Sequence, residues 1–83
     1  MFAMWERFAM DVSALRQELG LSLGEFAAKV GLTSRGHMSE IERGLTQPSV
    51  RVAIEIEKLS AGRLPAASLN DDVALIENFR GLQ

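Results

Sequence analysis

The sequence of 83 residues contains no cysteine and only one histidine, His37. Without cysteine, neither disulfide bonds nor thiolate metal sites can form, which excludes the small disulfide-stabilised scaffolds of many secreted proteins. A metal site or a catalytic centre needs several converging groups, and no such cluster accompanies the single histidine. We therefore expect a protein that is not an enzyme, with no catalytic residues, no metal and no cofactor.

Long apolar runs are also missing. No stretch reaches the ~18 apolar residues that a membrane-spanning helix requires. Residues 1–10 are apolar and aromatic but carry Glu6 and Arg7 in their middle, unlike a secretory signal. The apolar–polar alternation typical of strands is absent. We therefore expect an all-α protein in the cytoplasm, with no membrane partner.

Basic residues are slightly outnumbered, because nine Lys and Arg stand against eleven Asp and Glu, for a net charge of −2. Most nucleic-acid-binding domains are basic, so this total argues mildly against such a partner. The charge is not evenly distributed along the sequence. Residues 29–51 carry a net charge of +2, whereas residues 1–28 and 52–83 each carry −2.

Capping residues and apolar spacing predict a series of helices. They cover residues 11–19, 22–30 and 34–43, a fourth helix opened by residues 47–49 and ended by Gly62, a short helical turn over 65–69, and a last helix from Asn70 to Gly81. The residues predicted to face inward are Val12, Leu15, Leu19, Leu23, Phe26, Ala27, Val30, Met38, Ile41, Leu45, Val52, Ala53, Ile56, Leu59, Val73, Leu75 and Ile76.

The clearest helix start is at Ser22, because Glu25 follows at the spacing of a capping box. The next helix can be capped by either Thr33 or Ser34, and Gly31 lies in the short turn between the two. Two amphipathic helices joined by a short turn that contains glycine have the helix-turn-helix layout. In that layout the first helix braces the second, whose outer face enters the major groove of DNA.

Three segments carry a family resemblance: LRQELGLSLGEFAAKVGL, HMSEIERG and QPSVRVAIEIEKL. Together they resemble the phage-repressor (Cro/XRE-type) helix-turn-helix family. The resemblance implies a lambda-repressor-like bundle of about five helices with residues 34–43 as the recognition helix. It also implies a structural ion pair between Arg16 and Glu42, which would set the register of the helices.

The sequence departs from the family pattern at two places. Leu23 stands where the family usually has a glutamine that contacts DNA. The segment from Gly31 to Gly44 is one residue longer than the commonest pattern, which predicts an extended turn through TSRGH.

Residues of this turn and of the outer helix face are expected to contact double-stranded DNA. Arg35 is the best candidate to read a base, since a guanidinium can bond guanine through two hydrogen bonds. Glu40 could accept a hydrogen bond from cytosine, but an exposed acid near phosphate is more often neutral or repulsive, so it is not among the DNA-binding candidates. The DNA-binding candidates are Thr33, Ser34, Arg35, Gly36, His37, Ser39 and Arg43, and further phosphate contacts are assigned to Ser22, Lys29 and Arg51. The competing interpretation is a solvated loop with ordinary helix caps.

Two apolar stripes flank the helix-turn-helix core of residues 11–62. The first belongs to an N-terminal aromatic extension or extra helix, residues 1–10, and the second to a C-terminal helical segment, residues 63–83. Each stripe either packs on the protein's own core or forms a homodimer interface, where aromatic residues and methionine are enriched. The interface candidates are Phe2, Trp5, Phe8, Ile76 and Phe79.

Two functions are consistent with these patterns. The first is a sequence-specific, DNA-binding transcriptional regulator, such as a Cro-like repressor, that acts as a dimer. The second is a protein-interaction module on the same fold, an antiactivator or an antitoxin that masks a protein partner. The acidic total, Leu23 and the aromatic N-terminus favour the second.

Overall fold

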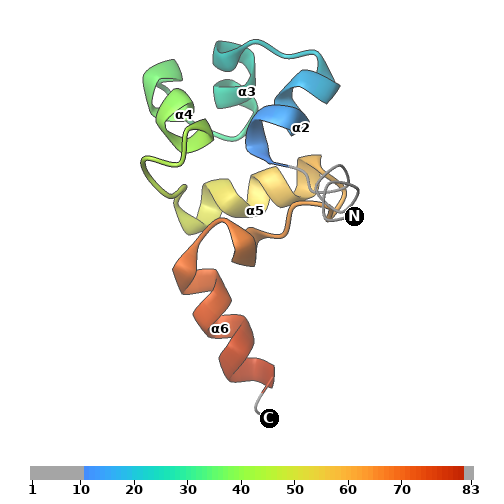
Figure 1. Ribbon diagram of the computed structural model, residues 1–83, viewed down its shortest axis with the longest axis vertical. Coiled ribbons are helices and arrows are strands. Elements are labelled where there is room, and N and C mark those ends of the chain that lie inside the picture. Colours follow the sequence, from blue (N-terminus) through green and yellow to red (C-terminus); the bar gives the residue numbers. More distant parts are fainter. Residues whose placement is uncertain (1–10, 82–83) are drawn as a thin grey trace, which may run out of the picture.

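The computed structural model describes residues 11–81, which contain five α-helices, one short 3-10 helix and no strand. The elements are α2 (Val12–Leu19), α3 (Leu23–Lys29), α4 (Arg35–Glu42), α5 (Val50–Leu59), η1 (Ala66–Ser68) and α6 (Asp71–Gly81). Helices α2, α3 and α4 lie on one side of α5, and η1 and α6 lie on the other (Figure 1). The predicted all-α helical bundle is confirmed. The predicted N-terminal extension, with Phe2, Trp5 and Phe8, lies outside the described residues.

Side-chain caps fix where the first four of these helices begin. In each case a serine or aspartate oxygen accepts a hydrogen bond from the backbone N–H three residues further on, which satisfies a group that the helix itself leaves unbonded. The donors and acceptors are Ala14 to Asp11 at 2.7 Å, Glu25 to Ser22 at 3.1 Å, His37 to Ser34 at 3.1 Å and Val52 to Ser49 at 3.3 Å. Of the two caps considered for α4, the structure therefore uses Ser34.

The core lies where α2, α3, α4 and α5 meet. Its largest fully buried apolar side chains are Phe26, Leu15, Met38 and Ile56, all of which were predicted to face inward. Leu64, in the loop after α5, is only 3% exposed and joins the same cluster. Helical spacing could not predict Leu64, because it belongs to no helix.

Two residues predicted to face inward lie near the surface instead. Leu45 is 67% exposed, because the chain leaves the helical path at Gly44, whose φ is +76°. Leu19 is 39% exposed in the last turn of α2. In both cases the apolar spacing continued past the point where the helix stopped covering the core.

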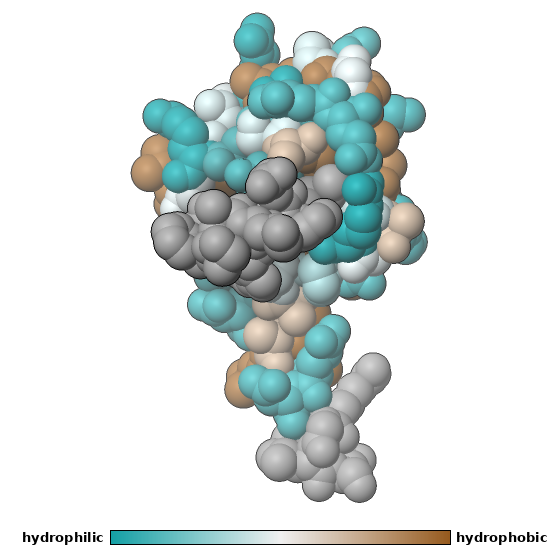
Figure 2. Space-filling model, turned by 45° about the vertical axis from the view of Figure 1, so that its right-hand side comes forward, coloured by the Kyte–Doolittle hydropathy of each residue, from teal (hydrophilic) through white to brown (hydrophobic). Residues whose placement is uncertain are grey.

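Two of the three residues of α6 that were predicted to face inward are also exposed. Helix α6 contacts mainly η1 and extends away from the body of the protein (Figure 1). Leu75 and Ile76 are therefore 68% and 52% exposed, whereas Val73 is half-buried. Figure 2 shows hydrophobic surface along this projecting helix.

The beginning of α6 is tied to the loop between α4 and α5. Asn70 is buried, and its Nδ2 donates to the carbonyl of Pro48 at 2.8 Å. Its Oδ1 accepts from the backbone N–H groups of Asp72 and Val73, as an N-cap does. The side chain of Gln47 accepts from the N–H of Asp71 at 3.1 Å. One end of α6 is thus fixed while the rest projects.

Within residues 11–81, no helix combines the length and the apolar character needed to cross a membrane.

Candidate nucleic-acid interface

Helices α3 and α4 pack on each other through a short turn. Phe26 and Ala27 of α3 and Met38 of α4 are buried between them. The chain reverses at Gly31, whose φ of +86° favours glycine. Because α4 begins at Arg35, residues 35–37 form its first turn and the predicted extended turn through TSRGH is wrong. Thr33 remains in the turn, where it is exposed.

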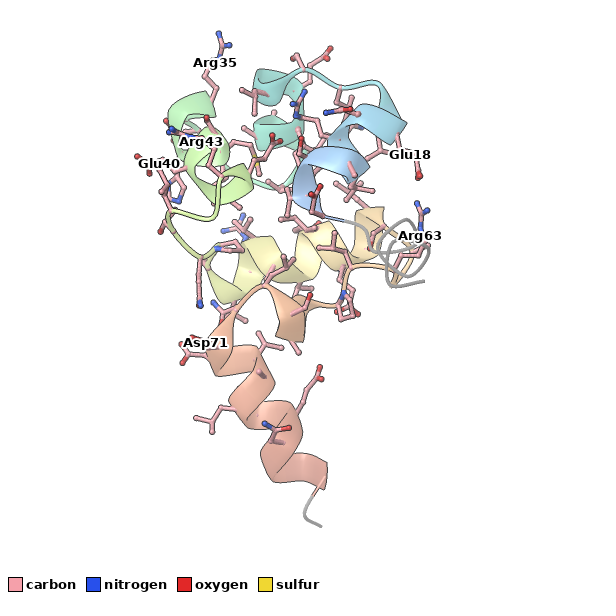
Figure 3. All side chains as sticks on the ribbon, in the orientation of Figure 1. Glu18, Arg35, Glu40, Arg43, Arg63 and Asp71 are labelled. Carbon is pink, nitrogen blue, oxygen red and sulfur yellow. The ribbon has the colours of Figure 1, made fainter. Side chains whose placement is uncertain are left out.

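The residues on the outer face of α4 can be inferred from the residues that are buried on its inner face. Met38 and Ile41 are buried, and at 100° per residue the opposite row consists of Gly36, Glu40 and Arg43, all of which are exposed. Figure 3 shows Arg35 extending into solvent from the beginning of α4 and Glu40 on the side away from α2 and α3.

The flanks of α4 hold the remaining candidates. Ser39 is half-buried on one flank beside Arg35, and His37 is exposed on the other. The outward row and its flanks thus bring all of the α4 candidates to one exposed side of the helix.

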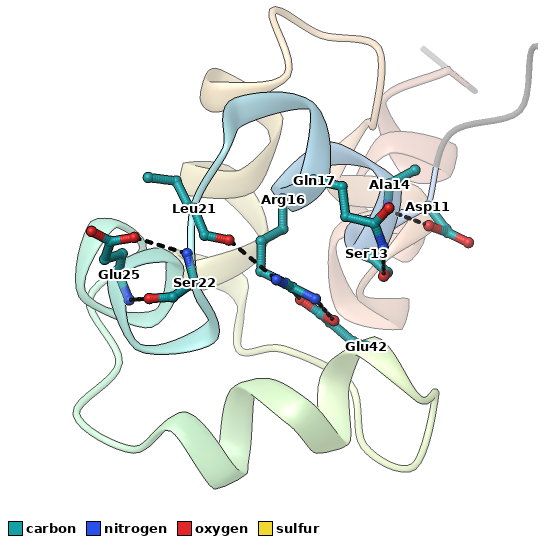
Figure 4. A network of polar contacts seen from close by, with 9 residues as sticks. All are labelled: Asp11, Ser13, Ala14, Arg16, Gln17, Leu21, Ser22, Glu25 and Glu42. Carbon is teal, nitrogen blue, oxygen red and sulfur yellow. Dashed lines mark hydrogen bonds and ion pairs between the residues drawn. The ribbon is translucent and has the colours of Figure 1, made fainter.

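Arg16 and Glu42 form an ion pair between α2 and the end of α4. Arg16 Nε donates to Glu42 Oε2 at 2.7 Å, and Arg16 Nη1 donates to the carbonyl of Leu21 at 3.1 Å (Figure 4). The two side chains are only 20% and 9% exposed. One guanidinium therefore connects α2, the segment before α3 and α4, and it fixes their relative positions.

The cations whose side chains the structure describes, a set that does not include Arg80, fall into two groups. Arg16, Lys58 and Arg63 each pair with a carboxylate, Glu42, Glu55 and Glu18 respectively. The others are exposed and form no ion pair with a described residue: Lys29, Arg35, Arg43 and Arg51. All four lie between residues 29 and 51, so the unpaired positive charge gathers around α4.

Arg51 reaches the turn between α3 and α4. A Cβ placed on Gly31 would lie 3.4 Å from Arg51 Nη2, so the guanidinium from the first turn of α5 lies against that turn. Positive charge from α5 is therefore added to the helix-turn-helix surface.

A family model described as helix-turn-helix matches residues 12–59, which span α2 to α5 and more than half of the chain. The chain belongs to the Cro/XRE-type helix-turn-helix family. Members of this family are DNA-binding regulators, and the resemblance carried by the three sequence segments is thereby confirmed. Helix α6 lies outside the matched region. No curated protein and no solved structure gives a significant match.

In this helix-turn-helix protein, Leu23 has a structural position. It is half-buried and packs against the core, so it offers no polar group where the family usually has glutamine. The neighbouring Ser22 is exposed, but its hydroxyl already accepts from Glu25 N–H within the capping box. The beginning of α3 therefore carries fewer free polar side chains than the family pattern implies.

Two carboxylates away from α4 have a lowered pKa. Hydrogen bonds from the backbone N–H and the hydroxyl of Ser22 lower the pKa of Glu25. The Arg63 guanidinium, which faces Glu18 (Figure 3), lowers the pKa of that carboxyl. Both serve the fold, since one caps α3 and the other joins α2 to the loop after α5.

The structure describes the side chains of only some of the predicted dimer-interface residues. Ile76 is half-exposed on α6, whereas the side chain of Phe79 lies outside the described part of the chain.

Glu40 was left out of the candidate DNA contacts because of its charge, although its spacing of four residues from Gly36 places it in the outermost row of α4. Among the described residues, no group of three or more metal-ligating side chains occurs.

Proposed function

We propose that this protein is a sequence-specific transcriptional regulator that places α4 in the major groove of double-stranded DNA. The observation that carries the proposal is which cations form ion pairs and which do not. In a protein with a net charge of −2, the four described cations without an ion pair surround α4. Phosphate contacts supply most of the affinity of a DNA-binding protein, and only such cations are free to make them without first breaking an ion pair.

In this proposal the candidate residues have different roles in binding DNA. Arg35 extends into solvent from the beginning of α4 and reads a guanine edge. Arg43, Lys29 and Arg51 contact phosphates and set the register on the duplex. Polar groups at the turn and on the outer face add shorter contacts, and Gly36 lets the backbone of α4 approach DNA closely. These additional contacts come from Ser22, Thr33, Ser34, His37 and Ser39.

The test is selection from a randomised duplex library, followed by fluorescence-anisotropy titration of the wild type, Arg35→Ala and Lys58→Ala. Lys58→Ala is the matched control, because it also removes one positive charge but from a side chain 70% exposed next to Glu55. We expect a consensus for the wild type, its loss at one position for Arg35→Ala, and its retention for Lys58→Ala. If no duplex is enriched, the proposal is wrong.

We propose further that two copies bind together through α6. Leu75 and Ile76 are exposed on a helix that projects from the body, and pairing would bury them. A dimer suits an operator with two half-sites about 34 Å apart. Sedimentation should show a dimer for the wild type and a monomer for Ile76→Lys. A monomeric wild type at the concentrations used for DNA binding would contradict this arrangement.

The second candidate is a protein-interaction module, and the same exposed residues of α6 favour it because they lie outside the matched family region. A hetero-complex held by apolar contacts would survive high salt, whereas a DNA complex would dissociate. A protein complex that persists at about 1 M salt, with no duplex enriched in the selection, would support this candidate over the first.

A further inference from the structure

Glu40 occupies the centre of the outer face of α4. It lies in the same row as Gly36 and Arg43, opposite the buried Met38 and Ile41. Its carboxylate is exposed and forms no ion pair with any described cation, although Arg43 follows three residues later. The protein thus keeps a free negative charge in the middle of its most cationic surface.

A carboxylate at this position is costly when α4 enters a groove. It is removed from water, which disfavours a charge, and it approaches a surface lined with phosphates. Arg43 could have neutralised it but does not. The cost is offset only if the carboxylate meets a hydrogen-bond donor on the DNA.

The base edges of the major groove offer few such donors. Guanine presents two acceptors and thymine an acceptor and a methyl group, whereas cytosine presents the N4 amino donor and adenine the N6 amino donor beside its N7 acceptor. A carboxylate can only accept hydrogen bonds, so the adjacent N7 of adenine repels it. Cytosine is the base whose edge suits Glu40.

We propose that Glu40 is a specificity-determining residue that selects cytosine at the base pair it faces. This inference rests on the proposed function and names the base chemistry of the same site. Gly36, one helical turn earlier, carries no side chain that would hold Glu40 away from the groove. Arg35 lies five residues before Glu40, about 7.5 Å along the helix axis, so the two side chains address different base pairs.

The experiment compares the consensus selected by the wild type, Glu40→Gln, Glu40→Ala and the control Glu55→Gln. Glu55 is a partly exposed carboxylate on α5, beside Lys58, so its replacement changes the net charge equally without touching α4. Because the Glu40 side chain is exposed, its variants should fold, and circular dichroism verifies this for each one.

We expect one cytosine position in the wild-type consensus. Glu40→Gln should shift that position toward adenine, since glutamine pairs with adenine N6 and N7, and Glu40→Ala should relax it by about tenfold in relative affinity. All other positions and the Glu55→Gln consensus should stay unchanged.

Two results would overturn the inference in different ways. If the Glu40 variants keep the wild-type consensus, whatever their affinity, the carboxylate does not read a base, and the proposed function stands without it. If the wild type itself enriches no duplex, the inference and the proposed function fail together.

Discussion

Gly36 lies in the first turn of α4 without a structural reason to be glycine. Its φ is not in the left-handed region, and a Cβ there would meet only Ser34 Oγ, at an ordinary 3.5 Å. Glycine in a helix costs about 0.5–1 kcal/mol relative to alanine. The fold therefore gains nothing from this residue, which is the pattern expected of a position kept bare for a partner.

Gly36→Ala should stabilise the protein and weaken DNA binding at the same time. We expect the free energy of unfolding to rise by about 0.5–1 kcal/mol, while the added methyl group obstructs the approach of α4 to the duplex. Thermal unfolding and anisotropy titration measure the two effects. Gly24→Ala, at the same place in α3 and also with open space around it, controls for the gain in stability. Undiminished DNA affinity of Gly36→Ala would show that the backbone does not come close.

Phe26 is the residue on which the core depends most, since it is fully buried between the helices of the helix-turn-helix. Phe26→Ala should cost about 3–5 kcal/mol through lost burial and a residual cavity. That is comparable to the whole stability of many small domains, about 5–15 kcal/mol. Urea unfolding followed by circular dichroism measures the loss. Val50→Ala, at a residue near the surface, should change stability by about 0.5 kcal/mol or less, and an equal effect of the two would refute this core assignment.

At the scale of elements, side-chain caps define where the helices of this protein begin. Helix α3 has only seven residues, fewer than an isolated helix needs in water. Its capping box bonds Ser22 N–H to Glu25 Oε1 at 2.9 Å and Glu25 N–H to Ser22 Oγ at 3.1 Å. The capping box therefore couples the stability of α3 to the ionisation of Glu25.

Acidification should expose this coupling. The pKa of Glu25 lies below its ordinary value of 4.5, so its ionised form stabilises the fold above about pH 4.5, and this contribution is lost as the pH falls through the folded-state pKa. Glu25→Gln keeps an acceptor for Ser22 N–H but cannot titrate. The stability difference between wild type and Glu25→Gln, measured by chemical denaturation from pH 7 to pH 3, should therefore shrink on acidification.

Glu18→Gln tests the same dependence of stability on ionisation at a second carboxylate, because Arg63 lowers the pKa of Glu18. A difference between wild type and either variant that stays constant over this pH range would contradict the assigned coupling for that carboxylate.

At the scale of the whole molecule, the segments before and after residues 29–51 are acidic. Among the cations with described side chains, those away from α4 are held in ion pairs, and those around α4 are not. In the proposed DNA complex this arrangement would provide few phosphate contacts per protomer, so the affinity would depend on where the charges lie rather than on their total.

The salt dependence of DNA affinity should therefore be set by these few phosphate contacts. If Lys29, Arg43 and Arg51 each neutralise one phosphate in both copies of a dimer, the log–log slope is about −5. We expect a slope shallower than about −6 when dissociation constants are measured by anisotropy between about 50 and 200 mM salt. A steeper slope would mean that cations beyond these participate.

Much of the architecture could be predicted because it follows from local rules. The positions of Asp11, Ser22 and Asn70 gave the helix starts, since capping depends on residues within one turn. The inward faces of α3 and α5 followed from spacing, because a helix of fixed period shows the same side to its neighbours. The pairing of Arg16 with Glu42, which are far apart in the sequence, came only from the family resemblance.

The helices, most of the core and the location of the positive block follow from residue types and their spacing along the chain. The packing of the elements determines that Leu64 is buried and that Leu45, Leu75 and Ile76 are not, because burial depends on which elements lie against each other. It also decided which charges are free. Arg16 and Arg63 are paired with carboxylates from distant segments, whereas Arg35 and Arg43 have none within the described chain. Such pairing depends on distances in space that no local pattern records.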